Sequence, residues 1–398
     1  MAHRLYEINP FVKSGLIIHD PLIRLCRAAA LTQGSKENMT ASSLDWTDNG
    51  RASAFAQWLA ATAPQHALRT DTVRLASADA SFRRYFRIDA ASGTGSFIIM
   101  DAPPAREDCA PFVKVAALMA NAGLNAPRVL AWDEPLGFML LSDLGAQTML
   151  DAIAPPAALD ARAAPTQAHF DLYMDAVDLL VRWQQASKPG VLPPFDDALL
   201  SRELALFPEW YVGRHRDFAL DARLMGRLEP LFAQIKASNL ESLGGARVYV
   251  HRDFMPRNLM VDKNGELGVL DFQDAVYGPI TYDIASLMRD AFLSWEEEFV
   301  LDITVRYWQK AGKAGLPVGD DFGEFYRAVE WMGLQRHLKV LGIFARLTLR
   351  DGKPKYLLDT PRFIKYARAT CARYRQLGPL MVLLDEIEGN ETRVGYTF

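Results

Sequence analysis

Two polar residues flank a short predicted hairpin in the second half of the chain. Asn258 precedes the apolar run 259–261, and Asp271 follows a second apolar run that ends at residue 270. The Asn-Gly pair between the runs tolerates the positive φ of a tight hairpin turn. We expect the fold-back to bring Asn258 and Asp271 together at the open end of the hairpin. An amide oxygen and a carboxylate are hard ligands that suit Mg²⁺.

Asp253 lies on the loop before Asn258, where it could accept a proton from a substrate hydroxyl. A loop Asp acting as base, a loop Asn and an Asp after a strand are the parts of kinase-type phosphoryl transfer. Each part alone is weak evidence, because a lone His-x-Asp is usually a surface or capping feature. The whole series in this order, followed by Asp283, predicts a phosphoryl-transfer site.

Longer strings around these residues resemble a known superfamily. Residues 250–260 and 270–290 resemble the aminoglycoside phosphotransferase and choline kinase superfamily, whose members are relatives of the protein kinases. Together with residues 100–104 and 333–337, these two strings are more similar still to the family of anomeric N-acetylmuramate/N-acetylglucosamine kinases of peptidoglycan recycling. The resemblance extends over about residues 45–395.

The resemblance implies an α+β, protein-kinase-like fold with two lobes. A nucleotide-binding lobe with a small antiparallel sheet would span residues 44–145, and a larger, mainly helical lobe would span 146–398. The implied activity is ATP- and Mg²⁺-dependent phosphorylation of the C1 hydroxyl of N-acetylmuramate and N-acetylglucosamine. Asp283 would support the catalytic loop, and we interpret His251 as a structural tether of that loop.

Hydrophobic patterns predict the elements that must position this site. In the first lobe we expect a helix within 45–63, strands at 72–76, 85–88 and 96–100, a helix at 110–122, and strands at 127–132 and 137–141. Beyond the hairpin we expect helices near 281–293, 296–312, 320–350 and 361–376. Residues 1–43 differ from the rest, and we expect a poorly ordered extension with Met39 as the native start.

Two stretches are candidates for nucleotide binding. The stretch 142–145 resembles a kinase hinge, so backbone groups of Ser142, Asp143 and Leu144 would hold adenine. The loop 78–85 takes the place of a glycine-rich loop but contains no glycine. Its hydroxyl and guanidinium groups could bind phosphate oxygens, and the candidates are Ser81, Arg83 and Arg84. A solvated hairpin tip is an equally good interpretation of this loop.

The third predicted strand lacks the lysine that kinases use for the α- and β-phosphates. Ile99 and Met100 occupy that part of the strand, and Asp101 follows. Another cation would have to take its place, and the candidates are Arg83, Arg84, Arg87 and Lys114. The alternative is a pseudokinase that binds ligands without catalysis. We favour substitution, because the base and both metal ligands are present.

The sequence says least about which residues recognise the acceptor. The resemblance places Glu203, Trp210 and Tyr211 on a helix that lines the acceptor pocket, and Gln273 and Asp274 directly follow the metal Asp. Core aromatics and surface acids would explain these residues equally well. A kinase for an aminoglycoside or a choline-like substrate is the main alternative function. The lactyl carboxylate of N-acetylmuramate would need a cation, for which we consider Arg336, His337 and Arg346.

Composition excludes several other classes of protein. The 398 residues carry a net charge of −4 and the pI is about 6.0, which argues against a nucleic-acid or anionic-membrane partner. Three cysteines, far apart, fit neither a disulfide framework nor a zinc site. No apolar run approaches the roughly 20 residues of a membrane span. We therefore expect a cytoplasmic, monomeric enzyme that acts on a small molecule.

Overall fold

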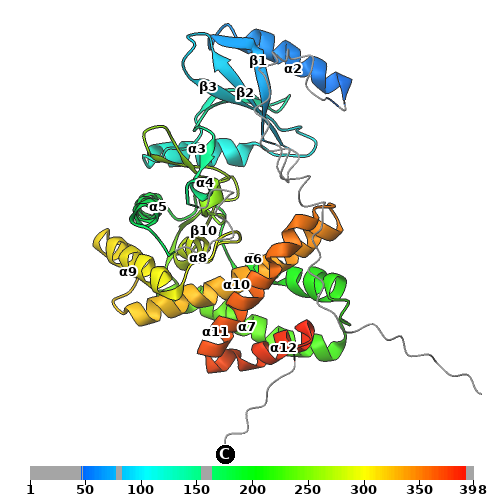
Figure 1. Ribbon diagram of the computed structural model, residues 1–398, viewed down its shortest axis with the longest axis vertical. Coiled ribbons are helices and arrows are strands. Elements are labelled where there is room, and N and C mark those ends of the chain that lie inside the picture. Colours follow the sequence, from blue (N-terminus) through cyan, green and yellow to red (C-terminus); the bar gives the residue numbers. More distant parts are fainter. Residues whose placement is uncertain (1–45, 47, 78–82, 154–163, 391–398) are drawn as a thin grey trace, which may run out of the picture.

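The computed structural model describes residues 46, 48–77, 83–153 and 164–390. The predicted extension 1–43 and the proposed start at Met39 lie outside these residues. Figure 1 shows a small lobe built on a sheet at one end of the molecule and a larger lobe of helices below it. The predicted α+β, protein-kinase-like architecture is thus confirmed, while the exact division at residue 145 stays a prediction.

The small lobe is a five-stranded antiparallel sheet with a helix on one face. The strand order is β1-β2-β3-β5-β4, and the strands are β1 (Leu68–Ser77), β2 (Arg84–Ala90), β3 (Ser96–Asp101), β4 (Val129–Asp133) and β5 (Phe138–Ser142). Helix α2 (Asn49–Thr62) begins where Asp48 accepts hydrogen bonds from the backbone N–H groups of Gly50 and Arg51. Helix α3 (Ala110–Asn121) follows β3. All the elements predicted for this lobe are present.

The larger lobe is mainly helical. Its helices are α4 (Met149–Ile153), α5 (Gln167–Gln185), α6 (Asp197–Leu206), α7 (Ala222–Gly245), α8 (Thr281–Met288), α9 (Glu297–Lys313), α10 (Phe322–Leu349), α11 (Thr360–Arg373) and α12 (Gly378–Glu388). Helix α10 crosses the lobe between the other helices (Figure 1). None of the helices in the described part of the chain is long and apolar enough to cross a membrane.

Two small sheets hold the loops of the candidate site. Strand β7 (Arg247–Val250) pairs antiparallel with β10 (Val276–Pro279), and both are largely buried. Strands β8 (Leu259–Val261) and β9 (Leu267–Val269) form the predicted hairpin, with Leu259 opposite Val269. The third strand of that sheet, β6 (Gln147–Thr148), pairs with β8.

The residues that the structure describes form three hydrophobic cores. One lies between α2 and the sheet and includes Phe55 and Phe86. Another lies among α7, α10, α11 and α12. The largest joins the opposite face of the sheet and α3 to the helical lobe. In that core the rings of Phe112 and Phe272 lie with their centroids 4.8 Å apart, so α3 is packed directly against the segment after β9.

Two helices differ from the sequence-based predictions. Helix α8 ends at Met288, not at residue 293, because the Asp290 carboxylate accepts hydrogen bonds from the next three backbone N–H groups and turns the chain. The helix predicted to run to Tyr211 is α-helical only to Leu206. It continues as a π-helix over Phe207–His215. Pro208 lies in the first π-helical turn and has no N–H for an α-helical hydrogen bond.

Candidate active site

The catalytic loop is fixed from behind by one buried carboxylate. Asp283, in the first turn of α8, has no exposed surface and accepts hydrogen bonds from the backbone N–H groups of His251, at 2.7 Å, and Arg252, at 3.0 Å. Arg252 has a φ of 79°, which is unfavourable for a residue with a side chain. The two hydrogen bonds to one carboxylate therefore hold the loop in a conformation it would not adopt alone.

His251 ties the catalytic loop to the end of the hairpin. Its Nε2 lies 2.9 Å from the carbonyl oxygen of Leu270, and its Nδ1 accepts a hydrogen bond from the backbone N–H of Asp253. Both contacts require a neutral ring protonated on Nε2. Burial lowers the pKa of His251, which favours that neutral form. Its side chain thus contacts backbone atoms on two sides, as a tether would.

Asp253 lies at the centre of the loop. Burial alone would raise the pKa of its carboxyl group, but the positive charges of Lys339 and Arg252, followed by Arg336, lower it below its ordinary value. The group is therefore ionised at neutral pH. The side-chain amide of Asn258 donates to the backbone carbonyl of Asp253 at 2.9 Å, which leaves the amide oxygen of Asn258 as its possible metal ligand.

Asp271 follows β9 and lies next to Asn258 across the hairpin. The backbone N–H of Leu270 donates to the carbonyl oxygen of Asn258 at 2.9 Å, so the hairpin closes where the sequence predicted. Asp271 has a φ of 61° and accepts a hydrogen bond from the side-chain amide of Gln273 at 2.9 Å. Desolvation by the surrounding atoms raises its pKa, and the negative charge of Asp253 raises it further. A bound cation would relieve that repulsion.

The donor set at this end of the hairpin fits Mg²⁺. It consists of an amide oxygen and a carboxylate, which magnesium accepts, and it lacks the sulfur and imidazole groups that favour zinc. In the described residues, no group of three or more His, Cys, Asp or Glu side chains is arranged to hold a metal by itself. The ion would therefore need phosphate and water oxygens to complete its coordination, as in phosphotransferases.

The predicted nucleotide residues separate into distinct positions. Ser81 lies outside the described residues. Arg83 forms an ion pair with Glu107, whereas Arg84 binds the buried Asp101 and lies over the ring of Trp46. The side chains of Arg83 and Arg84 therefore have different partners and do not form one phosphate-binding site.

The predicted hinge joins the sheet to the hairpin. The Asp143 carboxylate binds Arg87 at 2.6 Å and accepts from the hydroxyl of Ser96, while the hydroxyl of Ser142 accepts from the backbone N–H of Arg128. Burial opposes ionisation of Asp143, but the bonds from Arg87 and Ser96 lower its pKa overall. Leu144 lies directly over Gly268 of β9, where a Cβ atom would be 2.8 Å from its Cδ1. The hinge is therefore in contact with the metal-side hairpin.

The five predicted acceptor residues are not gathered in one site. Glu203 is 4% exposed and binds Arg252 at 2.7 Å and Lys339 at 3.0 Å, directly behind the catalytic loop. Gln273 binds Asp271, and Asp274 is exposed near it.

The two aromatic candidates belong to another part of the lobe. Tyr211 is fully buried in the core beneath α12 and donates to Glu388, and Trp210 lies under Arg214 in the same core. The π-helical turn explains the difference, because it changes which residues share a face with Glu203.

Sequence reasoning missed the residue that contributes most to the charge around Asp253. Lys339 of α10 is 7% exposed and donates to the phenol oxygen of Tyr282 at 3.0 Å as well as binding Glu203. Arg336, one turn earlier, is 2% exposed and faces the same ring. The available signal was a run of polar residues, including Arg336 and Lys339, within a helix that carries many apolar residues on both sides, because buried charged residues usually have a partner.

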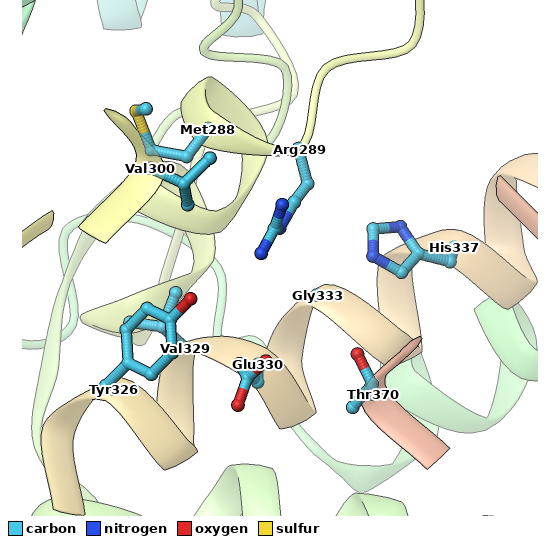
Figure 2. Close-up of a pocket in the computed structure, with 9 residues that line it drawn as sticks. All are labelled: Met288, Arg289, Val300, Tyr326, Val329, Glu330, Gly333, His337 and Thr370. Atoms are coloured by element: carbon cyan, nitrogen blue, oxygen red, sulfur yellow. The ribbon is translucent and has the colours of Figure 1, made fainter. Parts of the chain in front are cut away.

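A small pocket lies elsewhere in the helical lobe, away from the proposed catalytic and metal-binding residues. Figure 2 shows Arg289 and His337 directed toward a hollow between α8, α10 and α11, which Glu330 also lines. His337, which we considered for the lactyl carboxylate, lines this pocket, whereas Arg336 lies on the side of α10 that faces Tyr282.

The comparisons with known proteins agree with this geometry. Residues 72–321 match the model of the phosphotransferase enzyme family. The chain belongs to that family.

More particular relatives are two bacterial N-acetylmuramate/N-acetylglucosamine kinases. The one from Neisseria meningitidis serogroup B is 47% identical over 350 residues, which cover 86% of this chain and 97% of the relative. The one from Pseudomonas aeruginosa is 50% identical over 309 residues, covering 78% of this chain and 86% of the relative.

Solved structures with the same fold are more distant in sequence. An ethanolamine kinase of Plasmodium vivax has a TM-score of 0.55 and 11% identity, with 87% of this chain and 98% of that chain covered. A choline kinase of Streptococcus pneumoniae has a TM-score of 0.53 and 11% identity, with 80% and 99% covered. These two support the protein-kinase-like fold alone.

Proposed function

We propose that this protein is an ATP-dependent kinase for N-acetylmuramate and N-acetylglucosamine. It phosphorylates the anomeric C1 hydroxyl and supplies sugar 1-phosphates for peptidoglycan recycling. The observation that carries the proposal is the 47% identity to a kinase of that name over 97% of the relative's length. The hydrogen bonds that hold Asn258 to the loop of Asp253 and to the strand before Asp271 support the proposed chemistry.

Asp253 is the proposed general base. Its carboxylate orients the acceptor hydroxyl and takes its proton as the new oxygen–phosphorus bond forms and the bond to ADP breaks. The cations around Asp253 make it a weak base. An anomeric hydroxyl is more acidic than an ordinary alcohol, because the ring oxygen withdraws electron density. A weak base is therefore sufficient for this acceptor.

Asn258 and Asp271 are the proposed ligands of Mg²⁺. When bound, the ion would neutralise charge on the ATP phosphates. Gln273 holds one oxygen of Asp271, and the backbone carbonyl of Asp253 holds the amide of Asn258, so both ligands are oriented in advance. We further propose that the enzyme works as a monomer in the cytoplasm, on small molecules only.

The hinge and acceptor contacts complete the proposal. Adenine would bind to backbone groups of residues 142–144. Gln273 and Asp274 are the proposed sugar-binding residues nearest to the metal ligands. Glu203 would act through Arg252, which it holds behind the loop.

The test is ADP release from Mg-ATP with N-acetylmuramate, N-acetylglucosamine, kanamycin and choline offered separately. The expected product is a glycosyl 1-phosphate, identified by phosphorus NMR, from the two amino sugars. Turnover with kanamycin or choline alone would support the proposed mechanism but would show that the proposed substrate is wrong. No turnover with any of the four would favour a binding protein without catalysis.

A further inference from the structure

Strand β3 supplies no cation to the candidate site, although kinases of this fold use a lysine there. Ile99 and Met100 of β3 are completely buried, on opposite faces of the sheet. Asp101, which ends the strand, binds Arg51 and Arg84. The negative charge of ATP must therefore be met by a residue from another element.

Arg83, the residue before β2, is a cation that could meet the negative charge of ATP. Its Nε and Nη2 both donate to Oε2 of Glu107, at 3.2 and 3.1 Å, and the two side chains are only 12% and 16% exposed. It also forms a hydrogen bond with the phenol of Tyr85. Glu107 lies just before α3. Arg83 and Glu107 thus form a cation and a carboxylate pair between the sheet and the helix that follows β3.

Arg83 lies on the side of the sheet lobe that faces the proposed metal ligands. Tyr85, two residues further along and so on the same face of the strand, packs against the hydrophobic core that contains Phe272, the residue after Asp271. Arg83 is therefore directed toward the part of the helical lobe where ATP phosphates would meet the metal. Arg84 is not equivalent, because it shares the α2 side of the sheet with Phe86 and Trp46.

We propose that Arg83, oriented by Glu107, takes over the phosphate-binding role of the missing strand lysine. Glu107 then corresponds in function to the helix glutamate that positions the lysine in kinases. A guanidinium has five N–H donors, so it can hold Glu107 and still present donors to phosphate oxygens. This inference rests on the proposed use of ATP, and Glu107 is a positioning residue in it.

Calorimetric binding of Mg-ATP and of adenosine, without any sugar, tests the assignment. For Arg83→Gln we expect ATP affinity to fall roughly 10- to 100-fold, as for a lost charge-assisted hydrogen bond, with adenosine affinity unchanged. Glu107→Gln should weaken ATP binding less and in the same direction. The matched control is Arg74→Gln, which removes an exposed ion pair with Asp89 on the same sheet and should change neither affinity.

Steady-state kinetics provide the second part of this test. In Arg83→Gln the KM for ATP should rise and the KM for the sugar should stay constant, while Arg83→Lys should recover part of the loss. Thermal unfolding of each variant verifies that it is folded. Unchanged ATP affinity in Arg83→Gln, or equal losses for ATP and adenosine, would overturn the assignment. Because nucleotide binding is measured without an acceptor, a wrong sugar substrate would leave this test intact.

Discussion

The two lobes pair their charged residues around the candidate site differently. In the sheet lobe the three arginines nearest the predicted nucleotide site bind three different carboxylates: Arg83 binds Glu107, Arg84 binds Asp101, which Arg51 also binds, and Arg87 binds Asp143. In the helical lobe Glu203 binds both Arg252 and Lys339. The cations there exceed the carboxylates that bind them directly, and their remaining positive charge acts on Asp253.

This difference suggests a division of work between the lobes. The ion pairs of the sheet side fix its geometry, and none of their cations is among the charges that chiefly lower the pKa of Asp253. The shared cluster on the helical side keeps Asp253 ionised and, in the proposed mechanism, would place positive potential near the transferred phosphate. Replacing residues on the two sides should therefore have different consequences.

The largest effect is expected at Asp253. Asp253→Asn removes the proton acceptor but keeps the shape of the loop, so kcat should fall by about 10² to 10⁴. Mg-ATP affinity should be retained, since Asn258 and Asp271 remain. Coupled ADP-release kinetics and calorimetry measure the two quantities. Unchanged turnover would mean that the protein does not use the proposed chemistry.

The shared cluster should be the most sensitive part of the fold. Lys339→Met leaves Glu203 buried with one cation fewer and should reduce the free energy of unfolding by about 3 to 5 kcal/mol. The kcat should also fall, because less positive charge surrounds Asp253. Urea unfolding measures the first effect. A loss below 1 kcal/mol would contradict the view that the cluster is tightly coupled.

Asp283 should make stability depend on pH. Burial raises its pKa to about 6, from 3.8 in the unfolded chain. The native state therefore keeps the proton while the unfolded state loses it, so this group lowers the free energy of unfolding as pH rises from about 4 to 6. The contribution is about 3 kcal/mol. Unfolding curves of the wild type and Asp283→Asn should differ in slope over that pH range, and equal slopes would contradict the assignment.

The smallest effect is expected at the exposed edge of the sheet lobe. Arg74 and Asp89 form a surface ion pair with 46% and 37% of their side chains exposed. Arg74→Gln should change the free energy of unfolding by less than about 1 kcal/mol. A larger loss would show that pairing in this lobe is not local, which would remove the contrast between the two sides.

The sequence was sufficient to predict those parts of the site whose residues are close together in the chain. The hairpin between Asn258 and Asp271 was predictable, because its turn and its two apolar runs are adjacent. The cluster behind Asp253 was not, since Glu203 and Lys339 meet only when α6 packs against α10. Aromatic spacing is the same in a core and in a pocket, so the sequence could not predict that Tyr211 is completely buried and bound to Glu388.

The largest hydrophobic core has a consequence for how the molecule unfolds. It joins residues on both sides of the predicted boundary at 145, including Phe112 and Met139 on one side and Phe272 on the other. Separating the two lobes would expose this common interior to water. The enzyme should therefore lose its structure in a single cooperative transition in calorimetry, and a chain cut at residue 145 would leave two pieces that each lack part of their core.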